Sequence, residues 1–174
     1  MASPDDAARN APYLDASARA AWERNMAVNR TLVEDLEPAM LSARSPGGGA
    51  TVAQHLAHMV MTVKFWGDLI DPQRMATLPD LFRGEPEGGA PEYLDPETDT
   101  ERIAAVWRQT AEAALATAAA HPAGGPESPH EGGAAYLVHM LVHDAHHRGQ
   151  ILLALKTAGH PLPDEEAMWA PWRS

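Results

Sequence analysis

Histidine is the residue whose spacing in this sequence points most directly to chemistry. The chain contains nine histidines, and four of them fall between residues 139 and 147. One pair separated by four positions is weak evidence in such a composition, but the series His139, His143 and His147 is rarer. On a helix, residues four positions apart lie about 40° from one another around the axis. The three imidazoles are therefore predicted to share one face of a helix.

This histidine face forms a narrow polar stripe on an otherwise apolar segment. Three further polar side chains fall within about 60° of His143 on a helical wheel, namely His146, Gln150 and Tyr136. Most of the remaining circumference is apolar: Leu137, Met140, Leu141, Val142, Ile151, Leu152, Leu153 and Leu155. A helix that is apolar nearly all round is predicted to be central and buried. Polar groups buried there must be paired or bound to a ligand.

Two histidines one helical turn apart can bind a single metal ion, as they do in helical zinc sites. His143 and His147 form such a pair, and a third ligand must come from another element. An earlier segment offers His55 and His58, of which His58 shares the expected inward stripe with Thr62, Phe65 and Leu69. We interpret His58, His143 and His147 as a three-histidine site. Neutral imidazoles suit Zn, Ni, Fe or Cu, and the sequence does not choose among these metals.

A second interpretation of the same residues is a hydrogen-bonded polar core without a metal. In the metal interpretation, five residues surround the ligands as supporting or pocket residues: His55, His139, His146, Gln150 and Tyr136. Three other histidines stand beside prolines or glycines and are interpreted as exposed loop residues: His121, His130 and His160. Arg148 lies about 140° from His143 on the wheel, so we interpret it as a structural or interface residue.

Helical periodicity dominates the chain, and no segment shows a convincing strand alternation. Four helices are predicted, over residues 16–43, 52–69, 98–120 and 133–158, with Pro38 ending or kinking the first of them. Pairs that resemble capping boxes mark two helix starts, Thr51 with Gln54 and Thr98 with Glu101. Gly159 is a suitable C-terminal cap for the last helix.

These elements predict an all-α fold, a four-helix bundle that forms a single domain over residues 1–174. Residues 1–15 are expected to be a short N-terminal arm, and residues 161–174 a C-terminal tail. The connection over residues 71–97 is long, with a short helical turn around residues 75–82. It can carry the chain back to its starting end, so we expect an up-down-down-up arrangement with a crossover between the second and third helices.

Composition excludes several classes of protein. The chain has 174 residues with 13 basic and 24 acidic side chains, and the net charge of -11 gives no electrostatic reason to bind nucleic acid. No apolar run approaches the length of a membrane span, and the first residues do not resemble a signal peptide, so we expect a cytoplasmic protein. The absence of cysteine excludes a thiolate ligand or a cysteine nucleophile from this chain. Any thiol chemistry must use an external thiol.

Two segments resemble motifs of the DinB-like (DinB/YfiT-like) family of metalloenzymes. Residues 142–151 read V-H-D-A-H-H-R-G-Q-I, similar to the family signature H-x-x-x-H-R-G-Q, and residues 52–59 read V-A-Q-H-L-A-H-M, similar to its earlier L-x-H element. The resemblance covers residues 16–172 and implies a four-helix bundle. It also implies one divalent ion held by His58, His143 and His147, with Zn or Ni favoured over Fe, Mn and Cu. Family members are commonly homodimers, which implies the same for this chain.

The resemblance also implies an activity, because characterised relatives are mainly thiol-dependent enzymes such as bacillithiol S-transferases and mycothiol-dependent isomerases. Our leading hypothesis is a metal-dependent transferase that uses a low-molecular-weight thiol on a small-molecule substrate, in stress response or detoxification. Three protein ligands leave a coordination position open, as in catalytic sites. A metal-dependent hydrolase is the alternative, but neither Asp144 nor Asp68 lies on an inward histidine stripe to act as its base. A third possibility is a non-catalytic metal- or ligand-binding stress protein.

Overall fold

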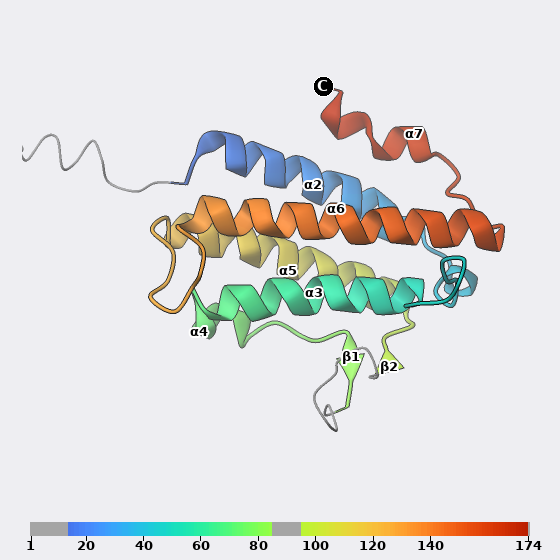
Figure 1. Ribbon diagram of the computed structural model, residues 1–174, viewed down its shortest axis with the longest axis horizontal. Helices are drawn as coiled ribbons and strands as arrows, with labels where there is room; N and C mark the ends of the chain where they lie inside the picture. Colours follow the sequence, from blue (N-terminus) through green and yellow to red (C-terminus); the bar gives the residue numbers. More distant parts are fainter. Residues whose placement is uncertain (1–13, 85–94, 174) are drawn as a thin grey trace, which may run out of the picture.

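The computed structural model describes residues 14–84 and 95–173, and this part of the chain is mostly helical (Figure 1). The named strands within it are β1 (Phe82–Arg83) and β2 (Asp95–Pro96), which pair in antiparallel fashion. None of the helices in these two ranges has both the length and the apolarity to cross a membrane. The architecture agrees with the expected all-α class, and the expected arm over residues 1–15 lies almost entirely outside the described residues.

Four long helices lie along the long axis of the molecule: α2 (Ala16–Glu34), α3 (Val52–Asp68), α5 (Thr100–Ala120) and α6 (Gly133–Ala158) (Figure 1). Helix α6 contacts the other three, α2 also packs on α5, and α3 also packs on α5. The chain runs in one direction along α2 and α6 and in the opposite direction along α3 and α5 (Figure 1). The two helices that carry the predicted metal ligands, α3 and α6, are therefore antiparallel neighbours.

Side-chain caps define where the helices begin. The predicted capping box at the start of α3 is confirmed, because Thr51 Oγ1 accepts the Gln54 N–H and Gln54 Oε1 accepts the Thr51 N–H. The box predicted for α5 is wrong. Asp99 is the N-cap, and its carboxylate accepts the N–H groups of Glu101 and Arg102. The carboxylate of Glu97 accepts the Thr98 N–H and holds that residue outside the helix.

The first long helix is shorter than predicted. It ends at Glu34 rather than near residue 43, and the chain continues as a 3-10 turn, η1 (Pro38–Met40). Proline lacks an N–H group and disfavours helical geometry in the preceding residue, and Glu37 is accordingly extended. The helix therefore ends before Pro38 instead of passing through it.

Short helical segments occupy two regions that the sequence left mostly irregular. Helix α4 (Pro72–Met75) is capped by Asp71, which places this turn ahead of the predicted residues 75–82. The C-terminal tail forms α7 (Glu165–Met168) and the 3-10 turn η3 (Ala170–Trp172), and both contact α2. The tail is thus packed against the first long helix.

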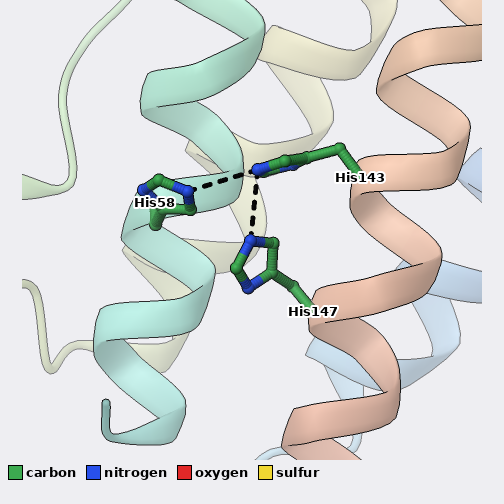
Figure 2. A group of neighbouring side chains, drawn as sticks. All are labelled: His58, His143 and His147. Carbon is green, nitrogen blue, oxygen red and sulfur yellow. Dashed lines mark hydrogen bonds between the residues drawn. The ribbon is translucent and has the colours of Figure 1, made fainter. Parts of the chain in front are cut away.

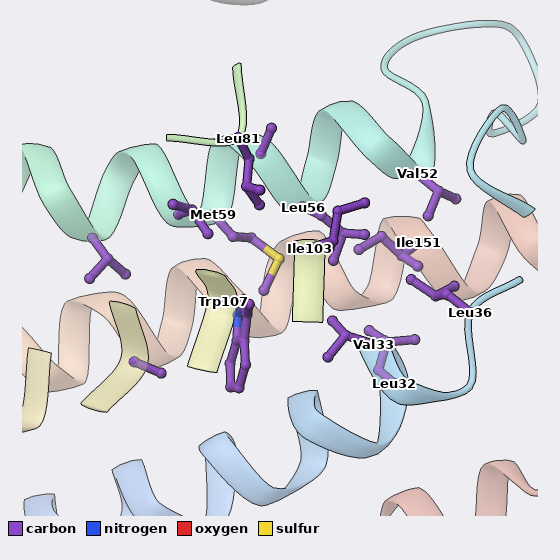
Figure 3. Close-up of a cluster of buried hydrophobic side chains, with 14 of the residues drawn as sticks. Leu32, Val33, Leu36, Val52, Leu56, Met59, Leu81, Ile103, Trp107 and Ile151 are labelled. Atoms are coloured by element: carbon purple, nitrogen blue, oxygen red, sulfur yellow. The ribbon is translucent and has the colours of Figure 1, made fainter. Parts of the chain in front are cut away.

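The core lies between the long helices and is built from one apolar stripe of each (Figure 3). Its buried side chains include aliphatic residues from α2, α3 and α6, together with Trp107 from α5. Trp22 of α2 is also fully buried, and its indole N–H donates to the carbonyl oxygen of Ala111 on α5. The tryptophans on α2 and α5 are therefore core residues.

The outer side of α6 corrects one expectation. An apolar circumference predicted a helix buried nearly all round, but Val138, Val142 and Leu153 are exposed, with Val142 at 60%. These side chains lie away from α2, α3 and α5 because only part of the helix faces the bundle interior. These three side chains leave an exposed apolar surface on the outer side of α6.

Two glycines of α6 provide a matched pair for testing how closely the helices pack. A Cβ atom on Gly133 would lie 2.3 Å from the carbonyl oxygen of Ala118 on α5, whereas a Cβ on Gly149 would meet nothing within 4 Å. We expect Gly133→Ala to lower the free energy of unfolding by about 1–3 kcal/mol because the helix must move. Gly149→Ala should raise it by about 0.5–1 kcal/mol, since alanine loses less backbone entropy on folding. Urea unfolding of both variants measures the difference, and equal effects would contradict the close contact.

Candidate metal centre

Three imidazoles from two helices converge between α3 and α6 (Figure 2). His58 projects from α3, and His143 and His147 project from α6, one turn apart. The Nε2 atom of His143 lies 3.2 Å from Nε2 of His58 and 3.1 Å from Nε2 of His147. All three side chains are half-buried, so the cluster is neither enclosed in the core nor fully exposed.

The contacts between these nitrogens fit a shared cation better than hydrogen bonds alone. A single Nε2 atom of His143 faces two others, and it carries one proton or one lone pair, which cannot point well at both. Zinc bound by imidazole has a metal–nitrogen distance of about 2.0–2.1 Å, so two tetrahedral ligand atoms are about 3.3–3.4 Å apart. The observed separations are within a few tenths of an ångström of that value. The donor set, three neutral nitrogen ligands, is suited to a divalent transition metal.

The second ring nitrogens differ among the ligands. Nδ1 of His143 is buried and has no hydrogen-bond partner among the described residues, so no protein group there fixes which nitrogen carries the proton. Nδ1 of His147 instead lies 3.0 Å from Nδ1 of His55, which stands one turn before His58 on α3. A metal on Nε2 would place the proton of His147 on Nδ1, where His55 can accept it. His55 is thus placed to orient a ligand.

Burial keeps two of the ligand imidazoles, those of His143 and His147, neutral. It lowers the pKa of His143 to about 4 and the pKa of His147 to about 3, and the neighbouring imidazoles add to both shifts. The pKa of His55 is lowered by burial too, with smaller effects from His58 and His146. Histidine must be neutral to bind a metal, so protons compete for these ligands only in acid. The site is therefore prepared for a cation at neutral pH.

The other predicted pocket residues lie at different distances from this cluster. The exposed ring of His146 contacts the ring of His147, with centroids 5.0 Å apart. Gln150 Oε1 lies 3.4 Å from the hydroxyl of Ser45. Tyr136 is fully buried, and its hydroxyl donates to the backbone carbonyl of Val63. Tyr136 thus serves the packing of α6 on α3, and His146 is the exposed polar group beside the ligands.

His139 belongs to a second histidine pair. Its Nδ1 atom lies 2.9 Å from Nε2 of His130, and the rings of both residues contact Trp66. Ser128 Oγ lies 3.1 Å from the other ring nitrogen of His130. The interpretation of His130 as an exposed loop residue is wrong, because the loop folds back and half-buries it against α6. Its neighbouring proline and glutamate carry no signal of this contact.

Sequence reasoning also missed a buried polar cluster on the opposite side of α6. It comprises four residues, Asn25, Asn29, Asp144 and Arg148, which are at most 5% exposed. A detectable signal was present, because Asn25 and Asn29 are one turn apart on the same stripe as the core residue Trp22. Arg148 is accordingly structural, as its place on the wheel suggested.

Comparison with known proteins agrees with the two motifs and the geometry of the site. The model of the DinB family matches residues 17–173, which is nearly the whole chain. This chain belongs to the DinB family. No curated protein and no solved structure matches it. Membership in the DinB family, together with the three-histidine cluster, is consistent with a metal-binding protein.

The lowered pKa values predict how the metal-free protein responds to acid. The folded state keeps His143 and His147 neutral, whereas the unfolded state protonates them near the ordinary value of about 6.5. Their contribution to stability is complete above that value and is lost as the pH falls toward the lowered values. His147→Gln removes one such group, so between about pH 7 and about pH 5 it should lose less free energy of unfolding than the wild type. Urea unfolding in the presence of a chelator measures this, and identical losses would contradict the lowered pKa.

Proposed function

We propose that this DinB-family protein binds one divalent metal ion through His58, His143 and His147 and uses it in catalysis. The observation that carries the proposal is a half-buried cluster in which Nε2 of His143 lies 3.2 Å from Nε2 of His58 and 3.1 Å from Nε2 of His147, with one ligand atom from each residue within 4.8 Å of the others. Three protein ligands leave at least one coordination position for a reactant. Neutral imidazoles suit several divalent metals, and we take Zn or Ni first, as the family resemblance implies, with Fe, Mn and Cu as alternatives.

The reaction that we propose is transfer chemistry with an external low-molecular-weight thiol of the bacillithiol or mycothiol type. When bound, the ion supplies a Lewis acid that lowers the pKa of a thiol at the open position. The chain itself contains no cysteine, so the nucleophile must be external. Two residues of the chain would support this chemistry: His55 would orient His147, and His146 presents an exposed imidazole beside His147 that would accept the thiol proton.

The carboxylates near α6 support the transferase over the hydrolase. Hydrolysis by metal-activated water benefits from a carboxylate base beside the ion. Asp144 follows a ligand in the sequence, but it is buried on the other side of α6, where Asn25 and Asn29 both donate to it. It therefore cannot reach a water molecule at the histidine cluster. His146 keeps the hydrolase as the second candidate, because an imidazole can also serve as a general base.

We also propose a four-helix bundle of the up-down-down-up type that forms a homodimer. The directions of the four long helices support the topology. The exposed side chains of Val138, Val142 and Leu153 on α6 support an interface of two copies because they form an apolar surface. Light scattering should then give a mass of twice 18.7 kDa. A cytoplasmic place and a role in stress response or detoxification belong to the same proposal.

Metal stoichiometry of single variants tests the ligand set. The wild type, dialysed against Zn²⁺ or Ni²⁺ and analysed by elemental mass spectrometry, should retain one ion per chain. His58→Ala, His143→Ala and His147→Ala should each lose it, because two imidazoles bind a divalent ion much more weakly than three. His139→Ala is the matched control and should retain the ion, since its ring is paired with His130. If the His139 variant lost the ion and the His147 variant retained it, the ligand pair on α6 would be His139 and His143, one turn from the proposed pair.

Thiol binding tests the proposed reaction class separately from metal binding. Addition of bacillithiol, mycothiol or glutathione to the Co²⁺-loaded protein should produce a sulfur-to-cobalt absorption band if the open position accepts a thiol. An alcohol of the same size should leave the spectrum unchanged. A Co²⁺ spectrum that no thiol alters would contradict the transferase and favour the hydrolase. Ester and amide substrates would then be the next to assay.

A further inference from the structure

The helix that carries two of the metal ligands also carries two buried charges. Asp144 is 1% exposed and Arg148 is 5% exposed, and both point from α6 toward α2. Asn25 and Asn29, one turn apart on α2, are both 0% exposed. Burial of four such groups is unfavourable unless each is hydrogen-bonded, so the contacts between them determine whether the interface is stable.

The two asparagines bridge the two charges. Nδ2 of Asn25 donates to Oδ2 of Asp144 at 2.7 Å, and Nδ2 of Asn29 donates to the same oxygen at 2.9 Å. One guanidinium nitrogen of Arg148 donates to Oδ1 of Asn25 at 2.9 Å and to Oδ1 of Asn29 at 2.6 Å. Each amide therefore accepts from the cation and donates to the anion. We call these four residues the amide bridge.

The amide bridge and the metal ligands alternate along α6. Asp144 directly follows His143, and Arg148 directly follows His147. Successive helical residues point about 100° apart, so the ligands face α3 while the charges face α2. A rotation of α6 about its axis would move both sets together. The positions of His143 and His147 relative to His58 are thus coupled to four hydrogen bonds on the other side of the helix.

We propose that the amide bridge is a positioning device for the metal centre, in which Asp144 and Arg148 set the rotation and register of α6 so that His143 and His147 meet His58. This inference rests on the proposed metal-binding function. Apolar side chains tolerate sliding and small rotations, whereas hydrogen bonds depend on direction and on pairing. Buried polar groups are known to set register in helical assemblies at a cost in stability. Here such groups lie immediately beside the residues that require a defined register.

The C-terminal tail completes the bridge by covering its cation. The Arg148 guanidinium lies 5.2 Å from the ring centroid of Trp169, which stands between α7 and η3. On the same side, Arg24 of α2 donates to the carbonyl oxygen of Pro171. The tail therefore limits water access to Arg148, and hydrogen bonds are stronger where water is excluded.

Cobalt binding by full-length variants tests the positioning role. Asp144→Asn keeps the size of the side chain but removes the negative charge that accepts hydrogen bonds from the amides of Asn25 and Asn29. Val28→Ala is the control, because Val28 is fully buried between Asn25 and Asn29 on α2 and its truncation destabilises the fold without removing any hydrogen bond of the bridge. For each protein we would measure thermal unfolding without metal, the Kd for Co²⁺, and the d–d absorption spectrum of the loaded form.

The proposal expects Asp144→Asn to raise the Kd for Co²⁺ about tenfold or more and to shift the d–d bands, as changes outside the ligand set do. Val28→Ala should keep the wild-type Kd and spectrum although it unfolds at a lower temperature. Equal Kd values and spectra for Asp144→Asn and Val28→Ala would overturn the positioning role. If Asp144→Asn does not fold, Arg148→Lys replaces it, with the same expectation and the same overturning result. A wild type that binds no Co²⁺ would instead overturn the proposed function, and the positioning role with it.

Discussion

Helix α6 carries two polar faces, one half-buried and one fully buried, and the other elements are arranged to provide partners for both. The imidazole of His143 lies beside that of His58 on α3. The charged side chains of Asp144 and Arg148 form hydrogen bonds with asparagine amides on α2. Helix α5 contributes no polar partner to either face and supplies apolar packing instead, approaching α6 so closely at Gly133 that no side chain fits there. Each of the other three long helices therefore makes a different kind of contact with α6: α3 through histidines, α2 through amides and α5 through apolar packing.

The charge of the candidate centre follows from its ligands. The described residues bring three imidazoles together without a carboxylate among them. An ion held by neutral ligands keeps its full positive charge, which makes it a stronger Lewis acid than one bound by carboxylates. The overall net charge of -11 works in the same direction, because an acidic protein attracts cations from a distance. The neutral ligands thus favour a reactive ion, and the negative net charge of the chain favours its attraction to the protein.

Local sequence patterns predicted the parts of this structure that depend on local physics. The bounds of α3 and α6 agree with the structure because a capping box and a C-terminal glycine mark them, and the residues chosen as ligands do converge. The end of α2 and the start of α5 were misplaced because Pro38 and Asp99 compete with longer helical patterns. The contact of His130 with His139 and the amide bridge are tertiary contacts between separate segments. A single sequence does not specify which segments pack together. The exposed side of α6 was missed for a related reason: apolar residues show where burial is possible, not which neighbour provides it.

The order of the ligands along the chain has a consequence for how the centre is assembled during synthesis on the ribosome. His58 emerges early, whereas His143 and His147 follow only after α5 and the preceding loop, at a sequence separation of 85 residues from His58 to His143. Trp169, which covers Arg148, is translated later still. A nascent chain therefore presents a single ligand helix for most of its synthesis, and the three-histidine cluster is incomplete until α6 has been made. In the proposed function, metal binding consequently waits for the docking of the last helix rather than for the folding of the first half.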